Sequence, residues 1–426
     1  MLKNIPVPAP EQLTARAREF AYPSAGTSAP GVDAAGIERQ FPLDPGTLMA
    51  QAREQTGLKD FGDDPFLEPL RILCASLREE VDLNAAGREN AYRRLMNILV
   101  TRLRLQALWD AHPEIMNLPV SRPIFIVGLP RSGTTFLHWL LARDPALRVA
   151  PFWELMFPLP FGDAASPLPD PDPRIDAARQ ALARLHEAAP DMVKMHQLEA
   201  EEPEEEIALL SLGFSSMAFE WSFAVPAFVA WYRRSDHSAG YAYFRKVLQT
   251  LQWLRGGDQW VLKAPMHMEN LGPLLKAFPD ATIVQTHRDP AAATVSLSSL
   301  TCYGIRSYFD HPNPLLVGEN ISAIVERLLQ GICRDRDPDD GRYVDIQFRE
   351  LMADPIAAIR RVCAAAGHGL SATAEQRMRQ WIADNPKGKH GGHDYAAADF
   401  GIDLEERRAA LRFYTDRFTV PPDRAA

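Results

Sequence analysis

The feature that most constrains this chain is the segment PIFIVGLPRSGTTFLHWLLARDP, residues 123–145. An apolar run of strand length, Ile124 to Gly128, leads into a glycine-bracketed turn and then into a helical pattern that begins near Thr134. Such a continuous apolar run suits a strand buried on both faces of a parallel sheet. Gly133 lets backbone amides converge on an anion, and the helix start adds its free N–H groups. The segment therefore predicts an anion-binding loop between a central strand and a helix.

Further strand-like runs occupy 260–263, 281–287 and 343–348, and each is followed by a turn and then a helix. Apolar strands separated by helices predict the α/β class, with a doubly wound parallel sheet flanked by helices. We expect an N-terminal arm and helical lead-in at 1–115, with a loosely packed arm over its first 45 residues. An α/β domain should follow at 120–426, with a helical insertion at about 174–250.

Composition restricts the function class. The chain has 426 residues, of which 46% are hydrophobic and 24% charged, as in ordinary globular proteins. A net charge of -9 argues against nucleic-acid binding, although a local basic site for a phosphorylated ligand is compatible with it. Four cysteines without paired spacing indicate free thiols. With no apolar run at the N-terminus to serve as a signal peptide, we expect a cytoplasmic protein.

One apolar stretch, residues 212–234, is long enough to span a membrane. Glu220 and Pro226 interrupt it, and a charge at the centre of a bilayer is costly. We therefore favour a buried helical hairpin or the wall of an apolar pocket, and no stable membrane insertion.

The loop at 128–135 has the glycine spacing of a Walker A motif but lacks its lysine. Thr134 stands at that position, and Thr135 takes the place of the Ser/Thr. Without a lysine to reach the β- and γ-phosphates, transfer from ATP loses its main charge clamp. Arg131, three residues earlier, could still hold a group at the far end of a ligand bidentately.

A phosphate loop with Lys or Arg in this earlier position resembles the sulfotransferases that use 3′-phosphoadenosine 5′-phosphosulfate (PAPS), which have a P-loop-type fold. Their 5′-phosphosulfate loop reads PKSGTT, and this chain has PRSGTTF at 130–136, with Arg for Lys. The resemblance implies that the 5′-phosphosulfate is bound by Arg131, Ser132, Gly133, Thr134 and Thr135, with Phe136 near the adenine.

A second motif fits the 3′-phosphate that such a donor carries. In that family an arginine at a strand end is followed eight residues later by a serine on the next helix. Arg288 and Ser296 have this spacing. The resemblance thereby implies a 3′-phosphate site, although Arg-Asp-Pro also caps helices. A glycine-rich basic loop at 385–395 resembles, more loosely, the segment that closes over the 3′-phosphate; a simple surface turn is the alternative for its Lys387, Gly388 and Lys389.

Sulfonate transfer to a hydroxyl needs a base for the acceptor proton and cations for charge on the bridging oxygen, and the scheme requires no metal. His267 follows a strand, near the place of the family's Lys-x-His segment, but stands four residues from Lys263 and not two. Glu154 is the second base candidate, since some branches use a glutamate after the first helix. A buried, satisfied histidine and an arginine-paired carboxylate are the competing interpretations. Lys263 would stabilise the leaving phosphate.

The neighbouring acidic run is interpreted structurally. Pro203 reads as a helix start, with glutamates up to Glu206 in the first turn favouring the helix dipole. His196, just before it, could reach the acceptor pocket.

Aromatic residues at 152–161 and 214–232 favour an apolar or amphipathic hydroxyl acceptor on the side of the helical insertion. The predicted activity is sulfonate transfer from PAPS, with 3′-phosphoadenosine 5′-phosphate (PAP) as product. PAPS-driven dehydration or elimination, a non-catalytic PAP-binding protein and a P-loop kinase are the alternatives. The sequence leaves the oligomeric state open, with a homodimer among the options.

Overall fold

The computed structural model describes residues 7–22, 34–63, 65–190, 195–386 and 395–423. Its centre is a five-stranded parallel sheet in the order β2-β3-β1-β4-β5. The strands are β1 (Ile124–Val127), β2 (Leu147–Val149), β3 (Gln259–Lys263), β4 (Thr282–His287) and β5 (Tyr343–Gln347). The strands expected near 124, 260, 281 and 343 are confirmed, whereas the three-residue strand β2 at the sheet edge has too little pattern to be recognised in the sequence.

The strands β3 and β4, which pair with β1 on its two sides, determine where a ligand site can form. Ile126 is in register with Lys263 of β3 and with Val284 of β4. Since β1 lies between β3 and β4, the chain order reverses at β1, and open α/β sheets bind ligands outside the carboxyl ends of strands at such a point.

Helices cover both faces of the sheet. Alternate residues of β1 enter different cores: Ile124 and Ile126 pack with the cluster around α6 and α18, whereas Phe125 and Val127 join the larger cluster that includes the N-terminal helices. The helices around the sheet are α6 (Thr134–Leu141), α14 (Leu271–Ala277), α15 (Pro290–Ile305), α16 (Pro314–Asp335), α17 (Phe348–Ala353), α18 (Pro355–Ala365) and α19 (Ala372–Asp384), with the turn η5 (Pro265–Glu269).

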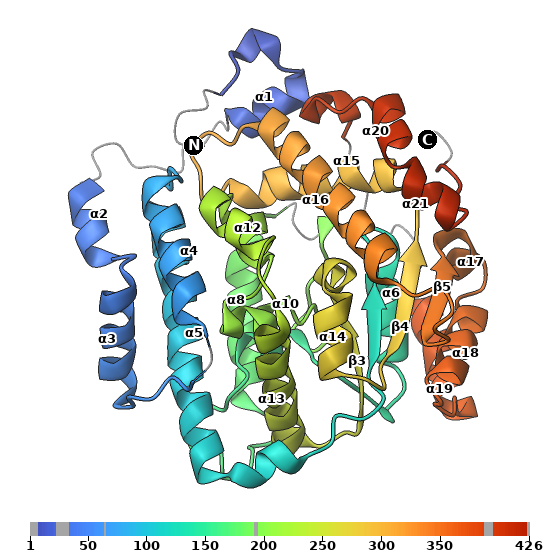
Figure 1. The fold of residues 1–426 in the computed structure, drawn as a ribbon, viewed down its shortest axis with the longest axis horizontal. Helices are drawn as coiled ribbons and strands as arrows, with labels where there is room; N and C mark the ends of the chain where they lie inside the picture. The colour runs from blue at the N-terminus through green and yellow to red at the C-terminus, as the bar shows by residue number, and fades with distance from the viewer. Residues whose placement is uncertain (1–6, 23–33, 64, 191–194, 387–394, 424–426) are drawn as a thin grey trace.

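The N-terminal helices form a layer on the side of the molecule away from α17–α19, with α13 between that layer and the sheet (Figure 1). Asp44 caps α3, as its sequence pattern predicts, by accepting the Thr47 N–H at 2.8 Å. The layer contains α2 (Ala34–Gln40), α3 (Pro45–Thr56), α4 (Leu67–Glu79) and α5 (Ala85–Ala111), and η3 (Pro113–Asn117) leads to β1.

Part of the N-terminal arm is held against the other end of the chain. After the short turn η2 (Pro10–Gln12), α1 (Ala15–Ala21) packs on α16 and on η6 (Ala397–Phe400) (Figure 1). The chain continues after η6 into α20 (Leu404–Ala410) and α21 (Arg412–Arg417). Phe20 is buried with its ring 5.9 Å from that of Phe400. A contact across such a sequence separation leaves no trace in local periodicity.

The insertion is helical only in pieces. The short helix α7 (Phe152–Met156) precedes the insertion. The insertion itself contains α8 (Pro173–Ala188), α10 (Ile207–Leu210), η4 (Ser211–Gly213), α11 (Ala218–Phe223), α12 (Pro226–Tyr232) and α13 (Ser238–Arg255). Left-handed backbone at Phe214 and Ala224 ends η4 and α11. The stretch 212–234 therefore forms a short helical hairpin, which lines a cavity of about 300 Å³. Among the described residues, no helix is long and apolar enough to cross a membrane.

Arg102 joins the N-terminal layer to the insertion. Its buried guanidinium donates to the carbonyls of Leu212 at 2.8 Å and Phe61 at 3.1 Å. It also lies between the rings of Phe66 and Tyr243, 4.1 Å and 4.3 Å from their centroids. A buried cation stacked between two aromatic faces contributes more than an exposed one.

We expect Arg102→Leu to lower the free energy of unfolding by about 3 kcal/mol, because it leaves buried carbonyls unpaired. Urea denaturation measures this. Arg93→Leu on the same helix is the control: Arg93 is exposed and pairs only with Glu89 among described residues, so its loss should cost under ~0.5 kcal/mol. Equal losses in the two variants would contradict the role given to Arg102.

Candidate active site

The turn after β1 is shaped by two glycines. A Cβ at Gly128 would lie 2.2 Å from the Thr286 hydroxyl. Gly133 has a φ of 90°, a backbone conformation that residues with a side chain rarely adopt. Ser132 donates its hydroxyl to the Leu129 carbonyl at 2.6 Å and is also hydrogen-bonded to Thr286 at 2.6 Å. The turn is therefore fixed to the end of β4, with α6 beginning directly after it at Thr134.

The two motifs predicted to hold the ends of one ligand meet in space. The Arg288 guanidinium donates through Nη1 to the Arg131 carbonyl at 2.6 Å. Its Nε donates to the carboxylate of Asp423 at 2.8 Å, and its Cζ lies 4.5 Å from the Phe348 ring centroid. Ser296 lies two turns into α15, with 8% of its surface exposed. Arg288 thus already holds one anionic group, supplied by the chain's own C-terminal segment.

The other predicted ligand-binding residues take different positions. Thr134 is buried and Thr135 half-buried in the first turn of α6. The Phe136 ring packs 5.9 Å from that of Trp381 in α19. Lys387, Gly388 and Lys389 lie outside the described residues.

Arg131 links the turn to a second cluster of charges. Its φ of 73° is unusual for a residue with a side chain, and such backbone strain is concentrated at functional sites. Its guanidinium donates to the Met195 carbonyl at 2.7 Å. The next residue, His196, lies 3.4 Å from the Glu204 carboxylate. The turn and the cluster around Glu204 are therefore neighbours.

Lys263, at the carboxyl end of β3, is the centre of that cluster. Its ammonium lies 2.7 Å from Glu205 and 3.8 Å from Glu204, and its backbone N–H donates to Glu206 at 2.7 Å. Burial lowers the pKa of Lys263, but the carboxylates of Glu205 and Glu204 more than offset this and raise it. The lysine therefore stays charged.

The two nearest glutamates differ in their affinity for a proton. Burial raises the pKa of Glu205, and the adjacent Glu204 charge adds to this against the pull of Lys263. Burial also penalises the Glu204 carboxylate, but Lys263 and His196 together lower its pKa. Burial lowers the pKa of His196, yet Glu204 raises it overall. One carboxylate of the pair thus stays ionised while the other can take up a proton.

His267 is fully buried, and both ring nitrogens are engaged. Nε2 donates to Glu206 at 2.7 Å, and Nδ1 lies 2.7 Å from the Tyr241 hydroxyl. It follows β3 as the sequence predicts, but it can receive a proton from a ligand only by breaking one of these bonds. The structure gives it a part in holding Glu206, which in turn accepts the Lys263 N–H.

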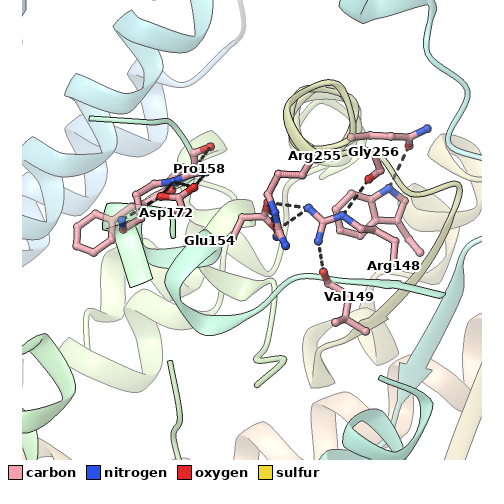
Figure 2. Close-up of polar contacts among 11 residues, drawn as sticks. Arg148, Val149, Glu154, Pro158, Asp172, Arg255 and Gly256 are labelled. Atoms are coloured by element: carbon pink, nitrogen blue, oxygen red, sulfur yellow. Dashed lines mark hydrogen bonds and ion pairs between the residues drawn. The ribbon is translucent and has the colours of Figure 1, made fainter. Parts of the chain in front are cut away.

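Glu154 lies in an ion-pair cluster. Figure 2 shows its carboxylate facing Arg148 and Arg255. Arg148 Nη2 donates to both carboxylate oxygens, at 2.6 and 2.7 Å, and Arg255 contributes a third contact at 3.2 Å. Glu154 has no exposed surface, and the Arg148 guanidinium stacks 4.5 Å from the Trp260 ring centroid. Of the two interpretations of this residue, the geometry favours the arginine-paired carboxylate.

The structural interpretation of the acidic run is wrong. Pro203 forms an isolated antiparallel bridge with Pro151, and α10 begins only at Ile207. The carboxylates of Glu204, Glu205 and Glu206 therefore lie before the helix and bind Lys263, His196 and His267. Three consecutive glutamates were the available signal, but two of their partners, Lys263 and His267, stand 57 to 61 residues further along the chain.

Within the described residues, no group of histidines, cysteines and carboxylates is arranged to hold a metal ion. The four cysteines form no disulfide, as their spacing predicts.

Comparison with known proteins agrees with this arrangement. The model of the sulfotransferase family matches residues 123–371. The omega-hydroxy-beta-dihydromenaquinone-9 sulfotransferase Stf3 of Mycobacterium bovis is 25% identical over 327 residues, which are 71% of this chain and 77% of the relative. Crystal structures of the sulfotransferases STF1 from Mycobacterium tuberculosis H37Rv and STF9 from Mycobacterium avium are similar as well.

STF1 is 29% identical with a TM-score of 0.74, covering 86% of this chain and 97% of its own. STF9 is 26% identical with a TM-score of 0.79, covering 93% and 99%. The parallel sheet, the turn after β1 and the family match over more than half of the chain lead to one conclusion: the chain belongs to the sulfotransferase family and is an enzyme with the P-loop-type fold.

Proposed function

We propose that this enzyme transfers the sulfonate group of PAPS to a hydroxyl group of an apolar or amphipathic small molecule. The observation that carries the proposal is the hydrogen bond from Arg288 to the Arg131 carbonyl, which joins the two predicted anion sites. A donor with negative charge at both its 5′ and 3′ ends needs two such sites at a fixed separation.

The residues present fit this donor. α6 begins at Thr134, directly after the turn, and no side chain caps its N-terminus, where the helix dipole favours an anion. Arg288 already pairs with a carboxylate, so an anion is accepted at its guanidinium. Ser296 and the loop from Lys387 to Lys389 remain further candidates for the 3′-phosphate. When bound, the donor supplies the activated sulfonate.

Glu205 is the base that the structure supports best. The side chain of Glu205 is 16% exposed, and of the adjacent pair Glu204 and Glu205 it is the one whose pKa is raised. All three candidates have partners, with Glu205 paired to Lys263, but the side chains of His267 and Glu154 have no exposed surface. In the proposed reaction the acceptor oxygen forms a bond to sulfur, the bond from sulfur to the phosphate oxygen breaks, and Glu205 takes the hydroxyl proton.

Lys263 and Arg131 would offset the charge on the departing phosphate in the proposed reaction. Both lie at the carboxyl edge of the sheet, and they are linked through Met195, His196 and Glu204. A fixed cation contributes most where water is excluded, and Lys263 is almost completely buried.

An apolar acceptor is supported by two observations. The insertion lines one mainly apolar cavity and the apolar wall of a second. The name of the relative Stf3 gives it a hydroxylated menaquinone derivative as substrate, which is a lipid alcohol. Dehydration driven by PAPS and PAP binding without turnover are the alternatives that the experiments below distinguish.

The donor site is tested by calorimetric titration with PAP, ADP and ATP–Mg²⁺. We expect tight PAP binding and a large loss for ADP, which lacks the 3′-phosphate. Arg288→Met should weaken PAP roughly 10- to 100-fold through the loss of charge-assisted bonds. Asp423→Asn should strengthen PAP binding, because it removes the carboxylate that competes for Arg288. Preference for ATP–Mg²⁺, or PAP affinity unchanged in Arg288→Met, would reject this site.

The base is tested by two matched substitutions. Glu205→Gln should lower kcat roughly 100-fold or more while PAP affinity changes little, as expected for loss of a general base. Glu154→Gln should leave kcat per folded molecule within about threefold but lower unfolding free energy by about 3 kcal/mol, since Arg148 and Arg255 lose their shared counter-charge. The reverse pattern would make Glu154 the base.

The pH dependence of kcat reports on the same group. A base acts in its ionised form, so kcat should rise with pH through an apparent pKa above the ordinary glutamate value of 4.5. The reason is that burial and Glu204 raise the pKa of Glu205. Glu205→Gln should remove this acidic limb from the residual activity. A limb that persists unchanged in Glu205→Gln would assign it to another group.

A further inference from the structure

A groove between α5 and the insertion has two chemically different walls. It has a volume of about 420 Å³, within the range of small-molecule sites. One wall is a single face of α5, where polar residues recur at helical spacing: Asn90, Arg93, Arg94, Asn97 and Thr101. The opposite wall is apolar and includes Leu155, Met156, Leu209, Leu212 and Phe223. We call this the α5 groove.

The α5 groove lies close to the cluster around Lys263. Ala208 and Leu209 of α10 line it, and Glu205 stands only three residues before Ala208. Leu155 and Met156 belong to α7, whose first residue donates its N–H to the Glu202 carbonyl at 2.9 Å. Three residues of chain span at most about 10 Å, so one end of the groove is near the proposed base.

Arg94 is the charged group that distinguishes this groove. Its Nη1 donates to the Ser222 hydroxyl at 2.9 Å, and its guanidinium lies 4.8 Å from the Phe219 ring centroid and 5.8 Å from that of Phe223. In the part of the chain that the structure describes, no carboxylate forms an ion pair with Arg94. None of the described residues lining the groove is acidic, in a chain of net charge -9.

A cation without a counter-charge in a partly desolvated groove favours an anionic ligand. The apolar wall favours hydrocarbon. We propose that the α5 groove binds the acceptor, and that the acceptor is an anionic amphiphile: an apolar body with its hydroxyl at one end and a carboxylate or other acid at the other. Arg94 binds the acid and determines acceptor specificity. This inference rests on the proposed function, since it deepens the acceptor of that reaction.

The kinetic test uses the full-length enzyme with PAPS, ω-hydroxy fatty acids of increasing length and the matching neutral 1-alkanols, all below their critical micelle concentrations. We expect the acids to have the higher kcat/KM, with an optimum length. Arg94→Gln should lower kcat/KM for the acids at least tenfold through KM, and for the alcohols less than threefold, while Arg94→Lys recovers part of the loss. Arg88→Gln, on the same helix but facing Glu38 and Phe41, is the control and should change neither.

A binding test keeps this inference separable from the reaction itself. Decanoate has no hydroxyl to accept a sulfonate, so its binding to the enzyme–PAP complex does not depend on turnover. We expect saturable decanoate binding that weakens at least tenfold in Arg94→Gln, with methyl decanoate binding equally to both proteins.

Equal kcat/KM for acids and alcohols with no response to Arg94→Gln would overturn the inference and leave sulfonate transfer standing. PAP binding without turnover of any hydroxyl compound would instead reject the proposed function. Decanoate binding that Arg94→Gln does not change would overturn the inference by itself.

Discussion

The parallel register of three strands places Arg131, Lys263 and Arg288 at one edge of the sheet. β1 lies between β3 and β4, so their carboxyl ends meet at one edge. β1 continues into the turn with Arg131, β3 ends at Lys263, and β4 ends just before Arg288. A shift of one residue in β3 would turn the side chain of Lys263 to the other face of the sheet, because side chains alternate along a strand. The apolar cores on both faces prevent such a shift and so fix the site as well.

The sequence allows the phosphate loop and its partner motif to be recognised because both are local. Each consists of a strand end, a turn and a helix start, and the residue types follow from backbone geometry, as Gly133 illustrates with its left-handed φ. Glu154 and Glu205 could not be separated in this way. Only the contacts in the structure make one an ion-pair carboxylate, held by Arg148 and Arg255, and the other a candidate base beside Lys263, which is 58 residues further along the chain.

The charged cluster around Lys263 carries a cost in stability. Burying an ammonium with three carboxylates requires desolvation that their mutual attraction offsets only in part. Apolar side chains of similar volume would give a simpler core. The charges instead set different proton affinities on adjacent carboxylates, with Glu205 raised and Glu204 lowered. Separation of two pKa values in one cluster is what acid–base chemistry near neutral pH requires.

Negative charge and positive charge lie at different places around the α5 groove. Glu204, Glu205 and Glu206 lie together at the sheet edge, whereas Arg94 lies on α5 across the groove. An acidic group of an acceptor is repelled by the glutamates and attracted by the guanidinium, and both effects are strong where water is excluded. An anionic amphiphile in the α5 groove would therefore bind in one direction, with its uncharged hydroxyl toward Glu205. Electrostatics would in this way orient the substrate before any contact specific to its shape.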